Sequence, residues 1–394
     1  MKLKCLPEDF RVEELTRVQP GKGTHAFYRL TKRSIGTPEA LSAIVRRFRI
    51  HRKQLNYGGL KDRHAVTVQY LTIRNGPRRG FTQKSFELEY LGQTDGPYGP
   101  QNFDGNRFQL ILRAMDDDAI AQALAAVDRI PTHGIPNYFD DQRFGSLGIS
   151  GEWIARAWCL GDYERALWLA LADPHKHDSA QEKKQKSILR DNWNSWPSCK
   201  AMLDRSHRRS IVTYLSDKVE AGKQADFRGA FARIKVDLRG LYLSAWQSAL
   251  WNRIVSRLLV ATISKPDDCT LGLRSGPAIF PVLSSDIATP LETLDVPLPS
   301  ARIKRPEGPV GDAFDAVLAE EGIELRQVRV KYPRDSFFSR LNRAAILRPS
   351  ELSATTGPDE LHPRSQALTL EFSLPRGSYA TMLVKSLTCG RQNH

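Results

Sequence analysis

All seven tryptophans of this 394-residue chain lie in its middle part, between residues 150 and 325. The same part contains helical patterns, a charged segment poor in apolar residues near 173–186 and a proline-rich tract over 277–309. The segments on either side alternate apolar and polar residues, which is typical of strands. We therefore predict an α+β fold in which a mainly helical domain, residues 151–330, interrupts a strand-rich domain formed by residues 1–150 and 331–394.

Individual elements can be predicted in each part. Strands are expected over 65–73, 108–113 and 369–374, and a helix begins at Thr37, where a proline and an acidic residue follow a capping threonine. A second helix follows three aspartates at 116–118 and is expected to end by Pro131. In the middle domain the strongest helix starts at Ser244, because apolar residues at 250, 254 and 258 share one face.

Charge indicates the kind of partner. Lysine and arginine number 58 against 44 acidic residues, a formal charge of +14, which favours a polyanion such as nucleic acid. The five cysteines include no C-x-x-C pair and the nine histidines show no metal-ligand spacing, so we expect neither a disulfide framework nor a metal site. No segment approaches the ~18 apolar residues of a membrane span. We expect a cytoplasmic protein that does not bind membranes.

Standard catalytic motifs are missing from the sequence. It contains no P-loop, Rossmann glycine signature, H-E-x-x-H or G-x-S-x-G, so nucleotide hydrolysis, hydride transfer, zinc proteolysis and α/β-hydrolase chemistry lose support. A basic patch is predicted where the helix that starts at Thr37 ends, although a solvated helix face is an equal alternative. After it, residues 61–64 form a charged loop before a strand. By themselves these residues favour a surface turn in which Asp62 caps the backbone.

Five segments of the chain resemble motifs of the TruD family of RNA pseudouridine synthases and occur in the same order. The charged loop belongs to one of them, which favours a functional role for it. The 56–69 segment NYGGLKDRHAVTVQ resembles G-x-K-D-[RK]-x-A-V-T-x-Q, and the 7–13 segment PEDFRVE resembles the opening P-E-D-F-x-V-x-E. Segments 105–113 (GNRFQLILR), 136–145 (PNYFDDQRFG) and 374–381 (LPRGSYAT) resemble three further motifs in the same order. Within the middle domain only QSALWN at 247–252 looks familial.

The resemblance implies a fold and a reaction. The fold is the split catalytic domain of pseudouridine synthases with a mainly helical inserted TRUD domain, and the reaction isomerises a specific uridine, with uridine 13 of a tRNA favoured, without a cofactor or metal. Asp62 matches the catalytic carboxylate, as a nucleophile or a base, and Lys4 its cationic partner. Phe108 matches the aromatic residue that stacks on uracil, and Asn106 would contact Asp62 or the base.

The basic residues near these motifs are expected to contact the backbone of a tRNA or another structured RNA. They are Arg46, Arg49, Lys53, Lys61, Arg63, Gln142 and Arg143. Arg143 has the alternative role of holding the loop below the catalytic cleft. We expect a monomer. Three alternatives stay open: a noncatalytic RNA-binding or chaperone protein on the same scaffold, an N-glycosidase that releases uracil, and the same enzyme acting at a different RNA site.

Overall fold

The protein is described here by a computed structural model, which covers residues 1–261, 270–281, 291 and 293–389. Contacts divide the chain into two compact units. The first unit contains Met1–Ile135 together with the C-terminal segment from Leu347, and the second contains the described residues from Pro136 to Ile346. The two short strands β9 (Ile135–Pro136) and β14 (Ile346–Leu347) mark where the chain passes from one unit to the other.

The first unit is built on a ten-stranded mixed sheet with the order β15-β16-β8-β2-β5-β3-β7-β6, in which β1 also pairs with β8 and β4 with β5. Only β2 and β5 are parallel, and the other pairs are antiparallel. The strands are β1 (Lys2–Leu3), β2 (Phe10–Thr16), β3 (His25–Arg33), β4 (Leu55–Tyr57), β5 (Val66–Arg74), β6 (Phe81–Gln83), β7 (Phe86–Thr94), β8 (Phe103–Met115), β15 (Ser350–Pro358) and β16 (Gln366–Pro375). Because β16 pairs with β8, the C-terminal segment shares a sheet with the N-terminal one, and the three predicted strands are confirmed.

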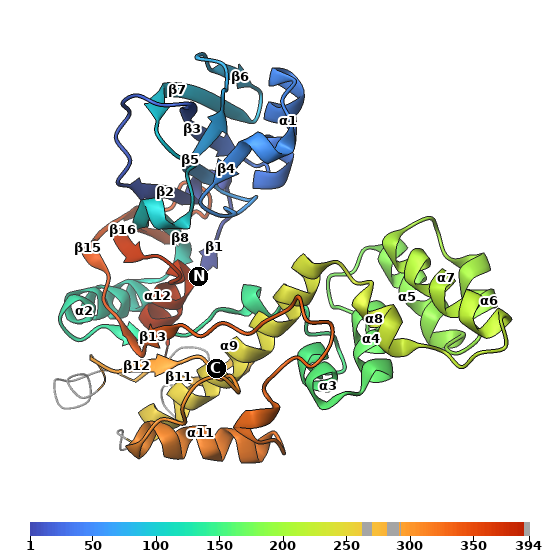
Figure 1. The fold of residues 1–394 in the computed structure, drawn as a ribbon. Helices are drawn as coiled ribbons and strands as arrows, with labels where there is room; N and C mark the ends of the chain where they lie inside the picture. The colour runs from blue at the N-terminus through green and yellow to red at the C-terminus, as the bar shows by residue number, and fades with distance from the viewer. Residues whose placement is uncertain (262–269, 282–290, 292, 390–394) are drawn as a thin grey trace. The chain divides into compact units, whose positions relative to one another are not determined.

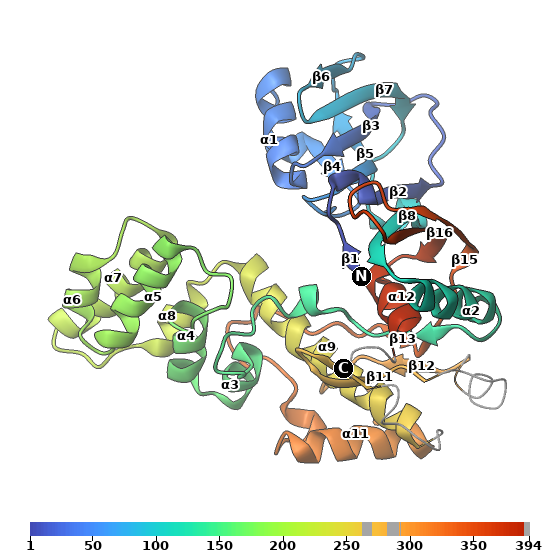
Figure 2. The same ribbon diagram turned by 180° about the vertical axis from the view of Figure 1, so that it is seen from behind.

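Three helices cover this sheet. Helix α1 (Thr37–Phe48) begins at Thr37, but the predicted capping role of this threonine was wrong, because Gly36 occupies the cap position and no side chain caps the helix. The apolar face of α1 packs on β3, β4, β5 and β7 (Figure 1). Helices α2 (Asp117–His133) and α12 (Ala380–Thr388) contact each other (Figure 2), and α2 also contacts β15 and β16. The predicted end of α2 at Pro131 was wrong, since the helix accommodates this proline in its last turn and Gly134 N–H bonds to the Ile130 carbonyl.

The second unit is mainly helical. Its described α-helices are α3 (Ile154–Leu160), α4 (Tyr163–Leu171), α5 (Ala180–Asp191), α6 (Trp196–Met202), α7 (His207–Glu220), α8 (Phe227–Ala232), α9 (Val236–Val260) and α11 (Gly308–Glu320). Two small antiparallel pairs join β10 (Thr270–Leu273) to β11 (Gly276–Ile279) and β12 (Asp295–Pro297) to β13 (Asn342–Ala344). The long helix α9 starts at Val236, earlier than the predicted Ser244, and buries Trp246 and Trp251 in the core.

The contact-based unit boundaries, at 136 and 346, differ from the sequence-based ones at 150 and 330. The Tyr138 hydroxyl lies 3.0 Å from Ser256 Oγ of α9 and donates to the Ile279 carbonyl at 3.1 Å, which ties residues after 136 to the second unit. At the other boundary, Asp335 accepts two hydrogen bonds of 2.8 Å from Arg239. These tertiary contacts leave no change in composition or hydrophobic pattern that would mark the boundaries in the sequence.

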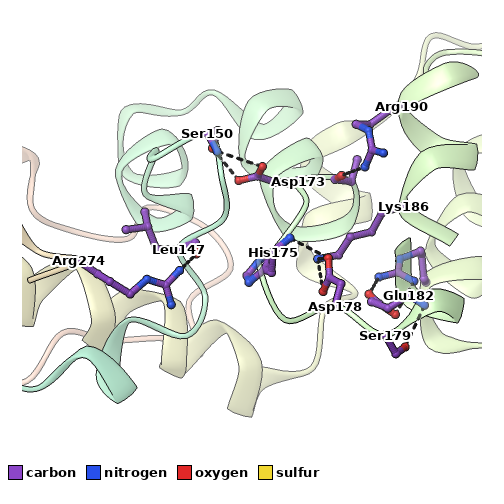
Figure 3. Close-up of polar contacts among 12 residues, drawn as sticks. Leu147, Ser150, Asp173, His175, Asp178, Ser179, Glu182, Lys186, Arg190 and Arg274 are labelled. Carbon is purple, nitrogen blue, oxygen red and sulfur yellow. Dashed lines mark hydrogen bonds and ion pairs between the residues drawn. The ribbon is translucent and has the colours of Figure 1, made fainter. Parts of the chain in front are cut away.

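The charged segment near 173–186 leads from α4 into the first turns of α5, and several of its charged side chains have polar partners (Figure 3). The buried Asp173 accepts hydrogen bonds from the backbone N–H and the hydroxyl of Ser150. Asp178 and Lys186 form an ion pair of 2.9 Å with almost fully enclosed side chains, and Ser179 caps the start of α5. The segment is therefore an ordered helix entry. Among the helices of the described residues, none combines the length and apolarity that a membrane span needs.

Candidate active site

The loop that carries Asp62 is fixed between α1 and β5 by side chains. The Lys61 N–H donates to Thr37 Oγ1 at 3.0 Å, and the same hydroxyl donates to Gln69 Oε1 at 2.9 Å. The Gln69 amide group in turn donates to the Gly59 carbonyl at 3.3 Å. Thr37 and Gln69 are fully buried, so these bonds are shielded from water. The backbone on both sides of Lys61 therefore has a defined position.

A buried lysine holds the loop from below. Lys32 on β3 is 1% exposed, and its ammonium group donates to the carbonyls of Asp62 at 2.6 Å and Ile35 at 2.9 Å. A longer contact of 3.4 Å reaches the Lys61 carbonyl. Burial lowers the pKa of Lys32 to about 8, although the nearby negative charges of Asp62 and Glu39 oppose this shift. The hydrogen bonds compensate the buried cation and orient the backbone of Asp62.

The Asp62 carboxylate forms an ion pair of 2.5 Å with Lys4 Nζ. The two side chains are 35% and 26% exposed, so the carboxylate is both paired and accessible to a substrate. Lys4 has a φ of 61°, which is uncommon for a residue with a side chain and costs about 1 kcal/mol. His64 Nε2 donates to the Lys4 carbonyl at 3.0 Å, which helps to keep this conformation. The Lys4 ammonium also lies 3.8 Å from the centre of the Phe10 ring.

Phe108 lies one aromatic contact away from this ion pair. It stacks on Phe372 of β16 with ring centres 5.3 Å apart and contacts Phe10 edge-on at 6.3 Å. Because Lys4 covers Phe10, the carboxylate, the cation and the aromatic residues form one continuous set of contacts. Phe108 is buried, as expected of a residue on the inner face of β8.

Asn106 and Lys61 form a second set of contacts beside the first. Lys61 Nζ donates to Asn106 Oδ1 at 2.6 Å and pairs with Glu14 Oε1 at 3.1 Å. Glu14 is buried and also accepts from the Tyr70 N–H at 3.0 Å. Asn106, predicted to contact Asp62 or the base, therefore contacts the neighbour of Asp62. Lys61, predicted to contact RNA, is 10% exposed because its charge is used inside the protein.

The other basic residues of the first unit lie on its surface. Arg46, Arg49 and Lys53 are exposed at the end of α1 and in the short helix η2 (Arg52–Gln54) that follows. Arg63 is also exposed, but it forms an ion pair with Glu39 of α1. Three of these predicted RNA-contacting side chains are thus available to a ligand, and the fourth would have to exchange its partner.

Gln142 and Arg143 belong to the second unit, in the short helix η4 (Asp141–Phe144). Gln142 is exposed, whereas Arg143 is half-buried and lies with its guanidinium 5.7 Å from the centre of the Phe139 ring. Its Nε donates to Ser248 Oγ of α9 at 3.4 Å. These contacts tie η4 to α9, and both predicted roles of Arg143, RNA contact and holding the loop below the catalytic cleft, stay predictions.

Sequence reasoning missed Lys32 and Glu14. Both lie where an alternating strand pattern predicts an inward-facing apolar residue. On β3, Lys32 follows the buried residues Ala26, Tyr28 and Leu30 at the same spacing of two. On β2, Glu14 follows the buried residues Phe10 and Val12 in the same way. A charged residue at an inward position needs a buried partner. This signal is present in the sequence once the strands are assigned.

Known proteins resemble this chain over nearly its whole length. A sequence model of the family described as tRNA pseudouridine synthase D (TruD) matches residues 1–387. The "Probable tRNA pseudouridine synthase D 1" of Methanococcus maripaludis is 30% identical over 397 residues, which cover 98% of each chain. The tRNA pseudouridine synthase D of Aquifex aeolicus is 27% identical and covers 99% of this chain and 98% of its own. A TruD crystal structure from Methanosarcina mazei covers 98% of this chain and 93% of its own with a TM-score of 0.74 and 24% identity, which confirms the α+β fold.

Proposed function

Because the chain belongs to the TruD family of tRNA pseudouridine synthases, which are isomerases acting on tRNA, we propose that it converts uridine 13 of a tRNA to pseudouridine and that Asp62 is its catalytic carboxylate. The observation that carries the proposal is the Asp62–Lys4 ion pair, which is accessible, held by buried side chains and adjacent to aromatic residues.

The reaction needs little more than this carboxylate. The bond between uracil N1 and ribose C1′ breaks, the base turns over, and a bond forms between C5 and C1′, after which the C5 proton is lost and N1 gains one. Two routes use Asp62: it attacks C1′ as a nucleophile, or it removes the proton at C2′ so that a glycal forms. Both need a deprotonated carboxylate, which the Lys4 ammonium stabilises at 2.5 Å.

The aromatic residues provide for the detached base. Stacking on an aromatic ring contributes about 1–3 kcal/mol per base and permits rotation in the plane of the ring. Phe108 is the proposed stacking residue, and its contact with Phe372 fixes the plane of its ring. The target uridine has to leave its own stack to reach Asp62, at a cost of a few kcal/mol. Contacts of Arg46, Arg49 and Lys53 with the RNA backbone would offset this cost.

The test compares two variants with an unmodified tRNA transcript. Asp62→Asn keeps the size of the side chain but removes its charge, so pseudouridine formation should fall below detection while tRNA affinity changes by at most a few fold. Asp104→Asn is the matched control, because Asp104 is an exposed carboxylate paired with Arg17 in the same sheet. Pseudouridine is detected by carbodiimide labelling and primer extension, which also identifies the modified position.

The outcomes separate the alternatives. Modification at another position would keep the enzyme class but change the site, and abasic positions would indicate an N-glycosidase. tRNA binding without any modification by the wild-type protein would favour a noncatalytic RNA-binding protein. Parallel loss of binding and activity in Asp62→Asn would contradict the assigned role of Asp62.

A further inference from the structure

The second unit contains a hollow lined by several positively charged residues. It has a volume of about 570 Å³ and lies between residues 300–302 and residues 328–338. Four of its lining residues are cationic, and they are Arg302, Arg329, Lys331 and Arg334. Among the described residues that line the hollow, none is acidic. We call these residues, together with Phe337, the 302–337 pocket.

The walls of the 302–337 pocket are held in place by a buried glutamine of α9. Gln247 donates to the Pro299 carbonyl at 3.0 Å and to the Ser339 carbonyl at 2.8 Å, and it accepts from the Ser339 N–H at 3.2 Å. A backbone hydrogen bond of 3.0 Å from Ala301 to Val328 closes a third side. Gln247 is the first residue of QSALWN, the segment of the middle domain that resembles the family. The pocket is thus a built feature of the fold.

The cations of the pocket have no acidic partners among the described residues. The carboxylate nearest in sequence is Asp335, but it accepts two hydrogen bonds of 2.8 Å from Arg239. Other cations of the same segment do have partners, since Lys304 pairs with Glu307 and Arg326 with Glu324. Like charges around one hollow repel each other, so the pocket is suited to a ligand that carries several negative charges.

An exposed aromatic residue adds a second kind of contact. Phe337 is 62% exposed, and the Arg302 guanidinium lies 5.9 Å from the centre of its ring. Its neighbour Phe338 instead packs on Trp246 of α9 at 6.1 Å, which anchors the segment. A cationic groove with an exposed aromatic ring is the usual arrangement for an unpaired nucleotide, because the cations bind phosphates and the ring stacks on the base.

We propose that the 302–337 pocket binds the backbone phosphates of the RNA substrate next to an unpaired nucleotide that stacks on Phe337. The four cations hold the phosphates, and Gln247 fixes the two segments of chain that carry them. The pocket contributes to affinity and contains none of the residues proposed for the chemical step. The inference rests on the proposed function for the identity of the ligand as RNA.

The test uses charge-matched double variants of the full chain. Arg329→Gln/Lys331→Gln removes two pocket cations, and Lys304→Gln/Arg326→Gln removes two exposed cations of the same unit that lie outside the lining. Affinity for unmodified tRNA is measured at several salt concentrations, and the rate of a single turnover is measured at saturating enzyme. Thermal unfolding confirms that each variant is folded.

The pocket variant should bind tRNA at least tenfold more weakly than the control variant, and the slope of log affinity against log salt should fall by about 1.5 because two phosphate contacts are lost. The rate at saturation should stay within twofold of the wild type. Phe337→Ala should weaken binding about tenfold without changing the salt slope, since stacking is uncharged. Equal affinities of the pocket and control variants would overturn the proposal, as would a salt slope that does not change.

Two further outcomes separate the pocket from the enzymatic function. If the wild-type protein binds tRNA through the pocket but forms no pseudouridine, the proposed function fails and the pocket stands. If duplex RNA competes for the pocket as well as single-stranded RNA does, the proposed unpaired nucleotide is wrong.

Discussion

The Lys32 ammonium donates a hydrogen bond of 2.6 Å to the backbone carbonyl of Asp62, the proposed catalytic residue. The contact places a cation directly beneath the loop, whereas Lys4 approaches the same residue at its carboxylate. The two lysines have different roles, because Lys4 stabilises the charge of the side chain and Lys32 fixes the backbone that carries it. Lys32 is therefore a positioning residue.

Replacement of Lys32 by methionine should change how stability depends on pH. The folded pKa of about 8 lies below the ordinary value of 10.5, so between these two values the unfolded chain keeps a proton that the folded protein has lost. The free energy of unfolding of the wild type should therefore rise by about 2–3 kcal/mol relative to Lys32→Met as the pH rises from 8 to 10.5. Urea unfolding at several pH values measures this, with the exposed Lys53→Met as control. Parallel curves for wild type and Lys32→Met would show that Lys32 has an ordinary pKa.

Much of the first unit could be predicted because its elements follow local rules. The start of α1 at Thr37 and the strand that begins at Val66 agree with the sequence patterns within one residue. Strand β8 is longer than predicted and begins at Phe103, because pairing with β2 and β16 extends it through residues with no alternating pattern. Such extensions depend on tertiary partners, which a single sequence does not display.

The candidate site shows the same division. The resemblance to the family's motifs predicted Asp62 and Lys4 as site residues, and the structure brings them together as an ion pair. The contacts of Lys61 with Glu14 and Asn106 could not be predicted, because they depend on which strands are neighbours in the sheet. Nor could the sequence reveal that Arg63 pairs with Glu39, since these residues lie 24 positions apart.

Replacement of Lys4 by methionine should lower the rate of modification about a hundredfold, the usual effect of removing one electrostatic group from an active site. The loss should appear in the single-turnover rate, because Lys4 contacts the proposed catalytic carboxylate of Asp62. Lys4→Arg should restore part of the rate, since it keeps the charge, and Lys2→Met is the control at a neighbouring exposed lysine. If Lys4→Met only weakens tRNA binding, Lys4 contacts the RNA and does not serve Asp62.

Phe108→Leu should reduce the rate of modification strongly while the protein stays folded. Leucine keeps the residue apolar on the inner face of β8 but cannot stack on a base. The matched control is Phe372→Leu, which removes the other ring of the same stacked pair and leaves Phe108 in place. Comparable rates and melting temperatures of the two variants would indicate that both phenylalanines serve packing alone.

A buried network of ion pairs outside the loop that carries Asp62 should determine how the free energy of unfolding changes at acidic pH. Arg113 of β8 pairs with Asp9 at 2.7 Å and with Asp359 at 3.1 Å. Burial by itself would raise the pKa of Asp359, but hydrogen bonds from the N–H groups of Ala114 and Leu361 and from Arg113 outweigh it and hold this pKa well below its usual range.

A carboxylate whose pKa is lowered by folding stabilises the folded state at pH values above its pKa in the unfolded chain. This stabilisation is lost as the pH falls and the carboxylate is protonated. The free energy of unfolding should therefore decrease as the pH falls below about 4, and Asp359→Asn should reduce this dependence while lowering stability at pH 7 by about 3 kcal/mol, because Arg113 loses a buried partner. Asp104→Asn, at an exposed ion pair, should leave the decrease in the free energy of unfolding at low pH unchanged. Urea unfolding between pH 3 and 7 measures this dependence. If the free energy of unfolding falls as steeply with decreasing pH in Asp359→Asn as in the wild type, groups other than Asp359 cause the acid sensitivity.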